Sequence, residues 1–287
     1  MEHRTLLLGH TGKMGLALQW AFQQIGTVIG YNSATLDATD LEAVGRVVRQ
    51  CQPHLIINAI AFVGVDFCEK EPALAQHVNT LLPRRLAQLS QELAVPLIHL
   101  SGSTVFGDRQ EGAWTERHCP SPINVYGVTK LAGDCLVAHH AQQHYIFRLP
   151  LLFGPSLQPN QFVEKLLAQA EQGTSSLRVA NDVFYSPSYS RDLAARMVQL
   201  YQEAIPWGVY HLYNGGDPSL YDLMHEFATH LVLSTEIQPA THRDFPSQGA
   251  KPLRVPLSSE KLPPLRPWQE AVADYCQLLK EQRARVC

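Results

Sequence analysis

Short apolar runs alternate with longer stretches of helical periodicity through the first half of the chain. The predicted strands are Thr5–Leu8, Thr27–Tyr31, Leu55–Ala59, Pro96–Leu100 and Tyr145–Leu149. The predicted helices between and after them are Met14–Gln24, Leu41–Gln50, Ala73–Leu93 and Val125–Ala141. This alternation predicts an α/β fold, with a Rossmann-type, doubly wound parallel sheet that is covered by helices on both faces.

The pattern becomes less regular after Pro150, where proline and glycine interrupt the apolar runs. We therefore predict a dinucleotide-binding domain over residues 1–150 and a smaller substrate lobe over residues 151–287, with some segments of the lobe returning to the sheet. A final helix is predicted over about Trp268–Arg283. Pro83 lies inside the third predicted helix and should kink or split it, because proline has no backbone N–H to donate.

The composition predicts a folded chain with a sizeable core. Hydrophobic residues make up 45% and charged residues 17% of the 287 residues. The net charge is −3 without a dense basic run, which argues against a nucleic acid or a membrane surface as partner. The apolar run Leu6–Leu8 is too short for a signal peptide or a membrane span, so we expect a cytoplasmic protein.

Cysteine and histidine positions predict neither disulfides nor a metal site. The six cysteines are scattered without a CxxC pair, which favours free thiols. His139, His140 and His144 lie close together on a predicted helix, but no cysteine or carboxylate stands at a helpful spacing. We interpret them as part of a solvated helix face.

A glycine-rich loop follows the first predicted strand and opens the first predicted helix. It has the spacing GxxGxxG and consists of Gly9, His10, Thr11, Gly12, Lys13, Met14 and Gly15. Such glycines let the backbone turn tightly, approach a pyrophosphate and pack the helix against the sheet. Free N–H groups and the positive end of the helix dipole then favour phosphate. We predict that this loop binds a dinucleotide.

The end of the second predicted strand favours NADP(H) over NAD(H). An acidic residue there would bond the ribose 2′-hydroxyl of NAD and repel a 2′-phosphate. Residues 30–33 instead read Gly-Tyr-Asn-Ser, and Asn32 can donate a hydrogen bond. Lys13, His10 and Arg4 are nearby cations or potential cations. NADP(H) is the expected cofactor, with NAD(H) as the alternative.

Tyr126 and Lys130 have the spacing YxxxK at the start of a predicted helix. Residues four apart lie on one helix face, so the phenol and the ammonium point into the same space. The neighbouring ammonium should bring the pKa of the tyrosine closer to working pH. In a reduction, Tyr126 would protonate a carbonyl oxygen while hydride arrives at carbon, and Lys130 would also hold the nicotinamide ribose.

Further motifs resemble those of a known family. They lie at Leu36–Asp40, Asn58–Phe62, Val65–Glu69, Val78–Ala87, Pro122–Gly133, Arg148–Gly154, Asn160–Phe162, Arg191–Ala194, Ala250–Pro252 and Pro267–Trp268. With these stretches the chain resembles the extended short-chain dehydrogenases/reductases, and among them the dTDP-4-dehydrorhamnose reductase family, nearly from end to end.

The resemblance implies roles for further residues. Those implied to lie at the cofactor are Asp37, Ala59, Ala61 and Asn79. Those implied to lie at the substrate are Phe62, Val105, Phe106, Arg148, Lys251 and Arg254. Some of these residues have a second interpretation. Asn79 either orders a proton-relay water or packs a helix, and Arg148 could instead form a buried ion pair. Lys251 and Arg254 either bind a diphosphate or are surface charges.

The chain departs from this family at the carbonyl-polarising threonine. Where the family has STDxVF, the sequence reads Ser-Gly-Ser-Thr-Val-Phe over residues 101–106, so Gly102 takes the place of the threonine. Glycine has no side chain to donate that hydrogen bond. Ser101, Ser103 and Thr104 are the candidate substitutes.

Three functions follow from these motifs. The first is NADPH-dependent reduction of a nucleotide-linked 4-keto-6-deoxy sugar, as in the dTDP-4-dehydrorhamnose reductase family. The second is a non-catalytic, NADP-binding regulatory subunit, because the chain also resembles the β subunit of methionine adenosyltransferase. The third is reduction of another ketone or imine in specialised biosynthesis, since a protonated imine needs the missing donor least. All three accept a small-molecule ligand, and the superfamily makes a homodimer a further expectation.

Overall fold

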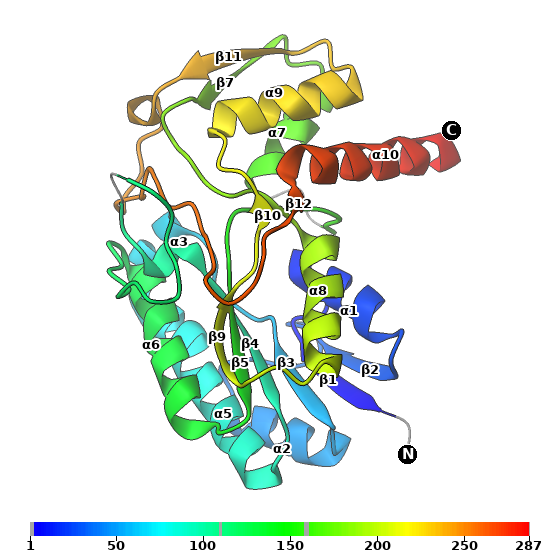
Figure 1. Ribbon diagram of the computed structural model, residues 1–287, viewed down its shortest axis with the longest axis vertical. Helices are drawn as coiled ribbons and strands as arrows, with labels where there is room; N and C mark the ends of the chain where they lie inside the picture. Colours follow the sequence, from blue (N-terminus) through cyan, green and yellow to red (C-terminus); the bar gives the residue numbers. More distant parts are fainter. Residues whose placement is uncertain (1–2, 109–110, 158–160, 287) are drawn as a thin grey trace.

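A computed structural model describes residues 3–108, 111–157 and 161–286 and contains a six-stranded parallel sheet (Figure 1). The strand order is β2-β1-β3-β4-β5-β9. The strands are β1 (Arg4–Leu8), β2 (Thr27–Tyr31), β3 (Leu55–Asn58), β4 (Leu97–Gly102), β5 (His144–Leu149) and β9 (Gly208–His211). The predicted Rossmann-type α/β fold is confirmed, and the five predicted strands are present within two residues at each end.

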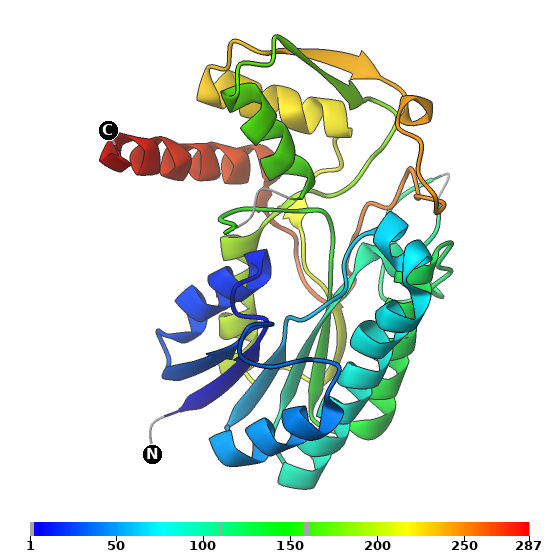
Figure 2. The same cartoon turned by 180° about the vertical axis from the view of Figure 1, so that it is seen from behind.

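Helices cover both faces of this sheet (Figures 1 and 2). The helices on one face are α1 (Lys13–Phe22) and α8 (Ser190–Gln202), and those on the other are α2 (Leu41–Cys51), α5 (Leu82–Leu93) and α6 (Val125–His140). Side chains alternate between these layers along β1: Leu7 packs with α1 and α8, whereas Leu6 and Leu8 pack against α2 and α5. The continuous apolar run of this strand therefore reflects burial on both sides.

The third predicted helix is interrupted, as Pro83 led us to expect. The segment contains α4 (Pro72–Gln76), a π-helical turn η1 over His77–Leu81, and then α5; a short α3 (Val65–Lys70) precedes them. Pro83 has no N–H for the carbonyl of Asn79, four residues earlier. Gly133 of α6 packs against that carbonyl oxygen, where a Cβ would approach to 2.2 Å. The interruption thus lets α6 approach η1 closely.

The remaining elements form a smaller lobe beyond the carboxyl ends of the strands (Figure 1). Its main elements are α7 (Phe162–Glu171), β7 (Ser176–Ala180), α9 (Leu220–Leu231), β11 (Glu236–Ala240), η3 (His242–Asp244) and α10 (Trp268–Val286). Its short strands are β6 (Leu152–Phe153), β8 (Ser188–Tyr189), β10 (Asn214–Gly215) and β12 (Leu265–Pro267). An aromatic cluster that includes Phe153, Phe227 and Tyr275 fills its core. Two segments, α8 and β9, return to the sheet domain. The lobe is therefore made of only part of residues 151–287.

Other expectations concern the surface and the thiols. No helix within the described ranges is long and apolar enough to cross a membrane. Five cysteines are free thiols in this structure. Cys287, as well as Asn160 of the family-like motif, lies outside the described residues.

Candidate active site

The glycine loop meets the end of β3 at the carboxyl edge of the sheet. The order β2-β1-β3 reverses its direction at β1, and ligands of open α/β sheets bind outside the carboxyl ends at such a switch point. Gly9 has a φ of +87°, which favours glycine, and a Cβ there would lie 2.9 Å from backbone atoms of Ala59. The Gly9 N–H donates to the carbonyl of Tyr31 at 2.7 Å. The loop therefore crosses the ends of β1, β2 and β3.

The start of α1 fits the phosphates of a dinucleotide. Its N-cap is Gly12, which has no side chain to bond the N–H groups of the first turn, and that turn contains no acidic residue. These N–H groups and the helix dipole favour an anion. Met14 packs into the core, so only its backbone faces this position. Thr11, Ala59 and Ala61 are partly exposed at the same edge.

Alanine substitutions at two glycines of this loop are expected to differ in their effect on Tm, although both should lower NADPH affinity. In Gly15→Ala the new methyl group would lie 2.0 Å from the Gly9 carbonyl oxygen, so both Tm and NADPH affinity should fall. In Gly12→Ala the nearest atom is 3.5 Å away, so Tm should change by only about 2 °C or less. NADPH affinity should still fall, because the second glycine is where the backbone approaches the pyrophosphate. Thermal unfolding and NADPH fluorescence titration measure both effects, and unchanged affinity in Gly12→Ala would contradict the loop's assignment.

Lys13 is turned away from the place of a 2′-phosphate, contrary to the sequence prediction. Its ammonium donates to Glu164 Oε2 of α7 at 2.7 Å and to the carbonyl of Leu152 at 2.8 Å. The two side chains are 1% and 9% exposed, and burial lowers the pKa of Lys13. The other Glu164 oxygen accepts from the Gly154 N–H at 3.3 Å. This ion pair joins the glycine loop to the substrate lobe.

Arg4 also lies far from the predicted phosphate. It begins β1 at the amino edge of the sheet, and its guanidinium donates to the carbonyl of Gln52 at 2.8 Å. His10 is the remaining predicted cation at the carboxyl edge. Its ring packs over Gly30 of β2, where a Cβ would lie 2.6 Å from the ring. Of the residues on which the sequence-based prediction of NADP(H) over NAD(H) depended, only His10 and Asn32 still support it.

Two predicted cofactor residues shape their own loops. Asn32 Oδ1 accepts from the Ala34 N–H at 3.1 Å. Asp37 Oδ1 accepts from the N–H and the hydroxyl of Thr39 at 2.8 and 2.7 Å, and these bonds lower the pKa of Asp37. Both loops follow β2, so contact of Asn32 and Asp37 with an adenosine moiety stays a prediction.

The capped start of α6 positions Tyr126. Asn124 is the N-cap: its side-chain oxygen accepts from the Gly127 N–H at 2.8 Å. Its amide nitrogen donates to the carbonyl of Ala250 at 2.8 Å. One side chain therefore fixes the first turn of α6 and ties it to a lobe segment.

Lys130 is buried one turn after Tyr126. Its ammonium donates to the carbonyl of Leu100 at 2.6 Å. Burial lowers the pKa of Lys130 to about 8, and the charge of Asp134 opposes this shift. Burial also raises the pKa of Tyr126, and the electrostatic interaction with Cys68 raises it further. The Lys130 ammonium by itself therefore does not produce the expected lowering of the tyrosine pKa, and the phenol stays protonated, as a proton donor requires.

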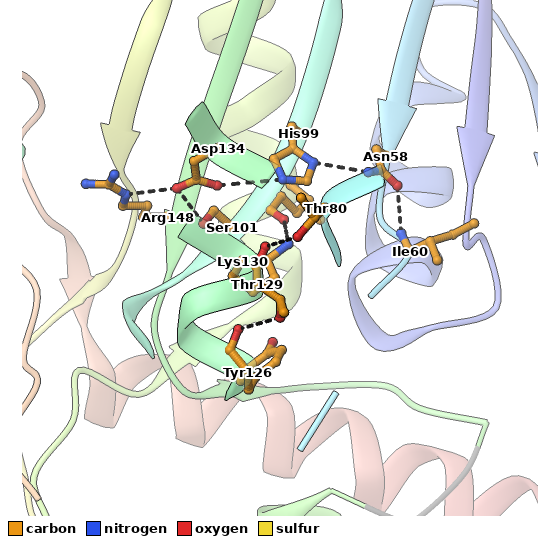
Figure 3. A network of polar contacts seen from close by, with 11 residues as sticks. Asn58, Ile60, Thr80, His99, Ser101, Tyr126, Thr129, Lys130, Asp134 and Arg148 are labelled. Atoms are coloured by element: carbon orange, nitrogen blue, oxygen red, sulfur yellow. Dashed lines mark hydrogen bonds and ion pairs between the residues drawn. The ribbon is translucent and has the colours of Figure 1, made fainter. Parts of the chain in front are cut away.

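A buried polar network lies between α6 and the sheet (Figure 3). Asp134 accepts from the Ser101 hydroxyl at 2.9 Å and from Arg148 Nε at 3.3 Å. The Asn58 amide nitrogen donates to His99 Nδ1 at 3.1 Å, which leaves the ring proton on Nε2, 3.7 Å from Asp134 Oδ1. Burial lowers the pKa of His99 well below its ordinary value, so the ring is neutral. The carboxylate of this network stands one helical turn after the active-site lysine.

Asn79 fixes the segment after β3. Its oxygen accepts from the Phe62 N–H at 2.9 Å, and its nitrogen donates to the Phe62 carbonyl at 3.0 Å and to the Thr129 hydroxyl at 3.3 Å. Asn79 itself is fully buried. These contacts favour the packing interpretation of Asn79, while partly exposed Phe62 remains a candidate substrate contact.

Val105 and Phe106 lie in a closed cluster, contrary to their expected contact with substrate. Neither has exposed surface, and the Phe106 ring stacks on Trp114 with centroids 4.7 Å apart. The Arg148 guanidinium carbon lies 5.3 Å from the Phe106 centroid. Arg148 therefore belongs to the buried ion pair with Asp134, the second of its two interpretations.

The three candidate hydroxyls around Gly102 have different surroundings. Ser101 donates to Asp134 on the α6 side of the sheet. Ser103 is 3% exposed and begins the 3₁₀ turn η2 (Ser103–Val105). The Thr104 hydroxyl is shielded from solvent and has no hydrogen-bond partner in the part of the chain that the structure describes. Ser101 lies within the end of β4, and Ser103 and Thr104 follow the strand at the carboxyl edge of the sheet.

A cavity of about 1090 Å³ lies in the lobe between α7, β7 and the segment 242–253. Its apolar lining includes Leu151, Phe162, Leu166, Leu177, Val179, Val183 and Leu220. Its basic lining residues are Lys165, Arg178, Arg243 and Lys251. The lining also includes Ile123, two residues before α6 begins. Apolar walls with a few charged groups are typical of a site for a small molecule.

Of the two basic residues predicted at the substrate, one lines this cavity. Lys251 does so while pairing with Asp66 at 3.2 Å. Arg254 is not among the lining residues; it pairs with Asp217 at 3.4 Å and packs over the ring of Phe184. Arg254 therefore supports the surface-charge interpretation.

Sequence reasoning missed two other cations of the cavity. Lys165 on α7 and Arg243 in η3 line it, and neither has an ion-pair partner within the described ranges. No local motif marks them, because they come to one space only through the packing of α7 on β7 and the pairing of β7 with β11, which precedes η3. The sequence pattern of α7 predicts a helix, but it does not predict that this helix lines a cavity.

Comparisons with known proteins agree with this geometry. The model of the RmlD substrate binding domain family matches residues 3–281. The chain belongs to this family. A dTDP-4-dehydrorhamnose reductase of Escherichia coli K12 is 33% identical over 76% of this chain and 74% of its own length. One of Streptomyces griseus is 31% identical over 94% of this chain and 92% of its own length.

Solved structures of this family have the same fold. The dTDP-4-dehydrorhamnose reductase of Bacillus anthracis, crystallised in complex with NADP, superposes with a TM-score of 0.89 at 28% identity and covers 96% of this chain and 99% of its own. The UDP-glucose 4-epimerase of Thermus thermophilus, at 19% identity and a TM-score of 0.83, shares the architecture. The RmlD-type fold thus extends over both the sheet domain and the lobe.

Proposed function

We propose that this chain is an NADPH-dependent reductase of a nucleotide-linked 4-keto-6-deoxy sugar, with dTDP-4-dehydrorhamnose as its first candidate substrate. The observation that carries the proposal is the position of Tyr126 and Lys130. They stand at the carboxyl edge of the sheet, where the glycine loop also lies, and the lining of the lobe cavity includes Ile123, two residues before their helix begins. Membership of the RmlD family and the names of the relatives support this substrate class.

The residues of the chain divide the chemistry of a ketone reduction. NADPH, when bound along the glycine loop, supplies hydride. The phenol of Tyr126 donates a proton to the ketone oxygen, and its raised pKa keeps that proton in place until negative charge develops. Lys130 supplies a buried positive charge one turn away, which stabilises the resulting phenolate.

The lobe cavity is suited to a nucleoside diphosphate sugar. Lys165 and Arg243 offer uncommitted positive charge for the diphosphate. Its apolar residues offer surface to a base, and its volume is that of a typical small-molecule site. Cations within a chain of net charge −3 favour an anionic ligand locally.

The test is oxidation of NADPH by the purified protein with dTDP-4-dehydrorhamnose, followed by absorbance and by identification of the product. Turnover with dTDP-rhamnose as product supports the proposal. Tight NADPH binding without turnover of the keto sugar would contradict it and favour the second candidate, a non-catalytic NADP-binding subunit, for which Gly102 is the specific observation. Turnover of imines alone would favour the third. A homodimer and a cytoplasmic location stay predictions, which size-exclusion chromatography and cell fractionation test.

The pH dependence of the reduction should follow Lys130. Because burial lowers the pKa of Lys130 to about 8, its ammonium loses its proton as pH rises through that value. Tyr126 remains a phenol over the same range, since burial raises its pKa. We therefore expect kcat/KM for reduction to be level below pH ~7 and to fall above pH ~8, as the positive charge disappears. A rate that increases through pH 8–9 would contradict this assignment.

Asp134→Asn is expected to lower the pH at which kcat/KM for the reduction begins to fall. The Asp134 carboxylate raises the pKa of Lys130, so removing its charge lowers that pKa and shifts the fall toward lower pH. Ser101→Ala removes a hydrogen bond to the same carboxylate but keeps the charge, so it serves as the matched control with a smaller shift. Thermal unfolding of both variants shows that the profiles belong to folded protein.

A further inference from the structure

The end of β4 leaves one requirement of the proposed reduction unmet. Oxygen of a ketone gains negative charge as hydride arrives, and oriented donors at that oxygen provide a large part of the stabilisation. Tyr126 is one donor. At the position of the second, Gly102 has extended backbone, with φ −143° and ψ 161°, and no side chain.

The nearest atom to the missing side chain is a hydroxyl oxygen. A Cβ built on Gly102 would lie 3.3 Å from Thr104 Oγ1, and the next neighbours are 3.8 and 3.9 Å away. The space beside Gly102 is therefore bordered by the Thr104 hydroxyl. That hydroxyl has no hydrogen-bond partner within the described ranges, although it is shielded from solvent. A buried, unpaired hydroxyl is costly and calls for an explanation.

Thr104 is also held against the helix that carries the proton donor. The Gly127 backbone of α6 packs on the Thr104 carbonyl so closely that a Cβ on Gly127 would lie 2.2 Å from that oxygen. Gly127 is the neighbour of Tyr126. The backbone of Thr104 is thereby fixed beside the catalytic turn, so its hydroxyl can change position only by a change of the side chain to another staggered rotamer.

The other two hydroxyls are less suitable. Ser101 donates to the buried Asp134 carboxylate of α6, so using it elsewhere would break the network of Figure 3. Ser103 is almost fully buried at the first position of η2. Thr104 is partly exposed as a residue, and its hydroxyl is the one that borders the space beside Gly102.

We propose that Thr104 supplies the second hydrogen bond to the substrate's carbonyl oxygen, replacing the donor that Gly102 lacks. This inference rests on the proposed reductase function. The hydroxyl turns from its unpaired position to the ketone oxygen and bonds it, without gaining or losing a proton. Tyr126 still provides the transferred proton, and the reaction's balance of one hydride and one proton is unchanged.

The test compares Thr104→Val, which keeps the shape but removes the hydroxyl, with Thr104→Ser, which keeps the hydroxyl. Thr104→Val should lower kcat for dTDP-4-dehydrorhamnose by about 10²–10³-fold, with KM changed by less than about threefold. Thr104→Ser should keep kcat within about tenfold of the wild type. The kinetic isotope effect with 4-deuterated NADPH should increase in Thr104→Val, because hydride transfer becomes slower relative to product release. NADPH fluorescence titration and thermal unfolding confirm that the variants are folded.

A second-site variant tests the geometry directly. Gly102→Thr placed in the Thr104→Val background should recover at least about tenfold of the lost kcat, because the one tight neighbour of a Cβ there, at 3.3 Å, is the end of the residue 104 side chain, which a small shift relieves. Loss of kcat in Ser103→Ala but not in Thr104→Val would overturn the inference and leave the reductase function intact. A wild-type protein without keto-sugar turnover overturns both. Equal losses in Thr104→Val and Thr104→Ser also overturn it, since they would reflect packing and not the hydroxyl.

Discussion

Phenylalanine in place of Tyr126 is expected to lower kcat for keto-sugar reduction by roughly 10²–10⁴-fold, the usual contribution of a positioned general acid. The substitution removes the phenolic hydroxyl and keeps the aromatic ring. Because the hydroxyl has no described hydrogen bond to protein, Tm should change by only a few degrees. Stopped-flow or steady-state oxidation of NADPH measures the loss.

The control for this variant is NADPH binding. Its affinity should stay within about threefold of the wild type, since the glycine loop and Lys130 are untouched. A variant with full activity would show that the proton comes from elsewhere, and Tyr126 would then be a packing residue of α6. Loss of both activity and binding would indicate a change in structure, which circular dichroism would detect.

Breaking the ion pair between Lys13 and Glu164 is expected to have the largest effect on stability. Glu164→Gln leaves the Lys13 ammonium buried without its carboxylate, and losing one partner of a buried pair costs about 3–5 kcal/mol. For a chain of this size such a loss lowers Tm by roughly 10 °C. Differential scanning calorimetry and urea unfolding measure the change.

Removing both charges gives the matched control. In Lys13→Met/Glu164→Leu no charge is left buried, so much of the lost stability should return. The same variants decide between two roles of Lys13. If Lys13→Met weakened NADPH relative to NADH binding and left Tm unchanged, Lys13 would reach a 2′-phosphate as its sequence position first indicated. The observed pair predicts the reverse: a large change in Tm, and a similar change in affinity for both cofactors.

Much of the dinucleotide domain followed from sequence. The runs around Leu7 and Ile57 are buried on both faces of a parallel sheet, and such strands appear as continuous apolar stretches. Pro83 correctly marked a break in its helix, because the missing N–H acts locally. The Tyr126–Lys130 pair shares one helix face for the same local reason, helical periodicity.

Side-chain partners were predicted less well. Arg4 was expected near the cofactor, yet it starts a strand that ends there, so it lies at the opposite edge. Val105 and Phe106 follow the motif at the end of β4, but packing with Trp114 closes them off from any ligand. Sequence proximity to a motif does not give the direction in which a side chain points.

The sequence by itself determined the order of elements, the glycine loop and the catalytic pair, because each depends on residues close together in the chain. The tertiary structure alone decided which long-range partners the charged and polar groups take. It paired Lys13 with Glu164, 151 residues away, and Ser101 with Asp134. It also placed the Thr104 hydroxyl beside Gly102 without a hydrogen-bond partner among the described residues. These partnerships arise from burial, since a charge or hydroxyl removed from water bonds whichever group the fold brings near it.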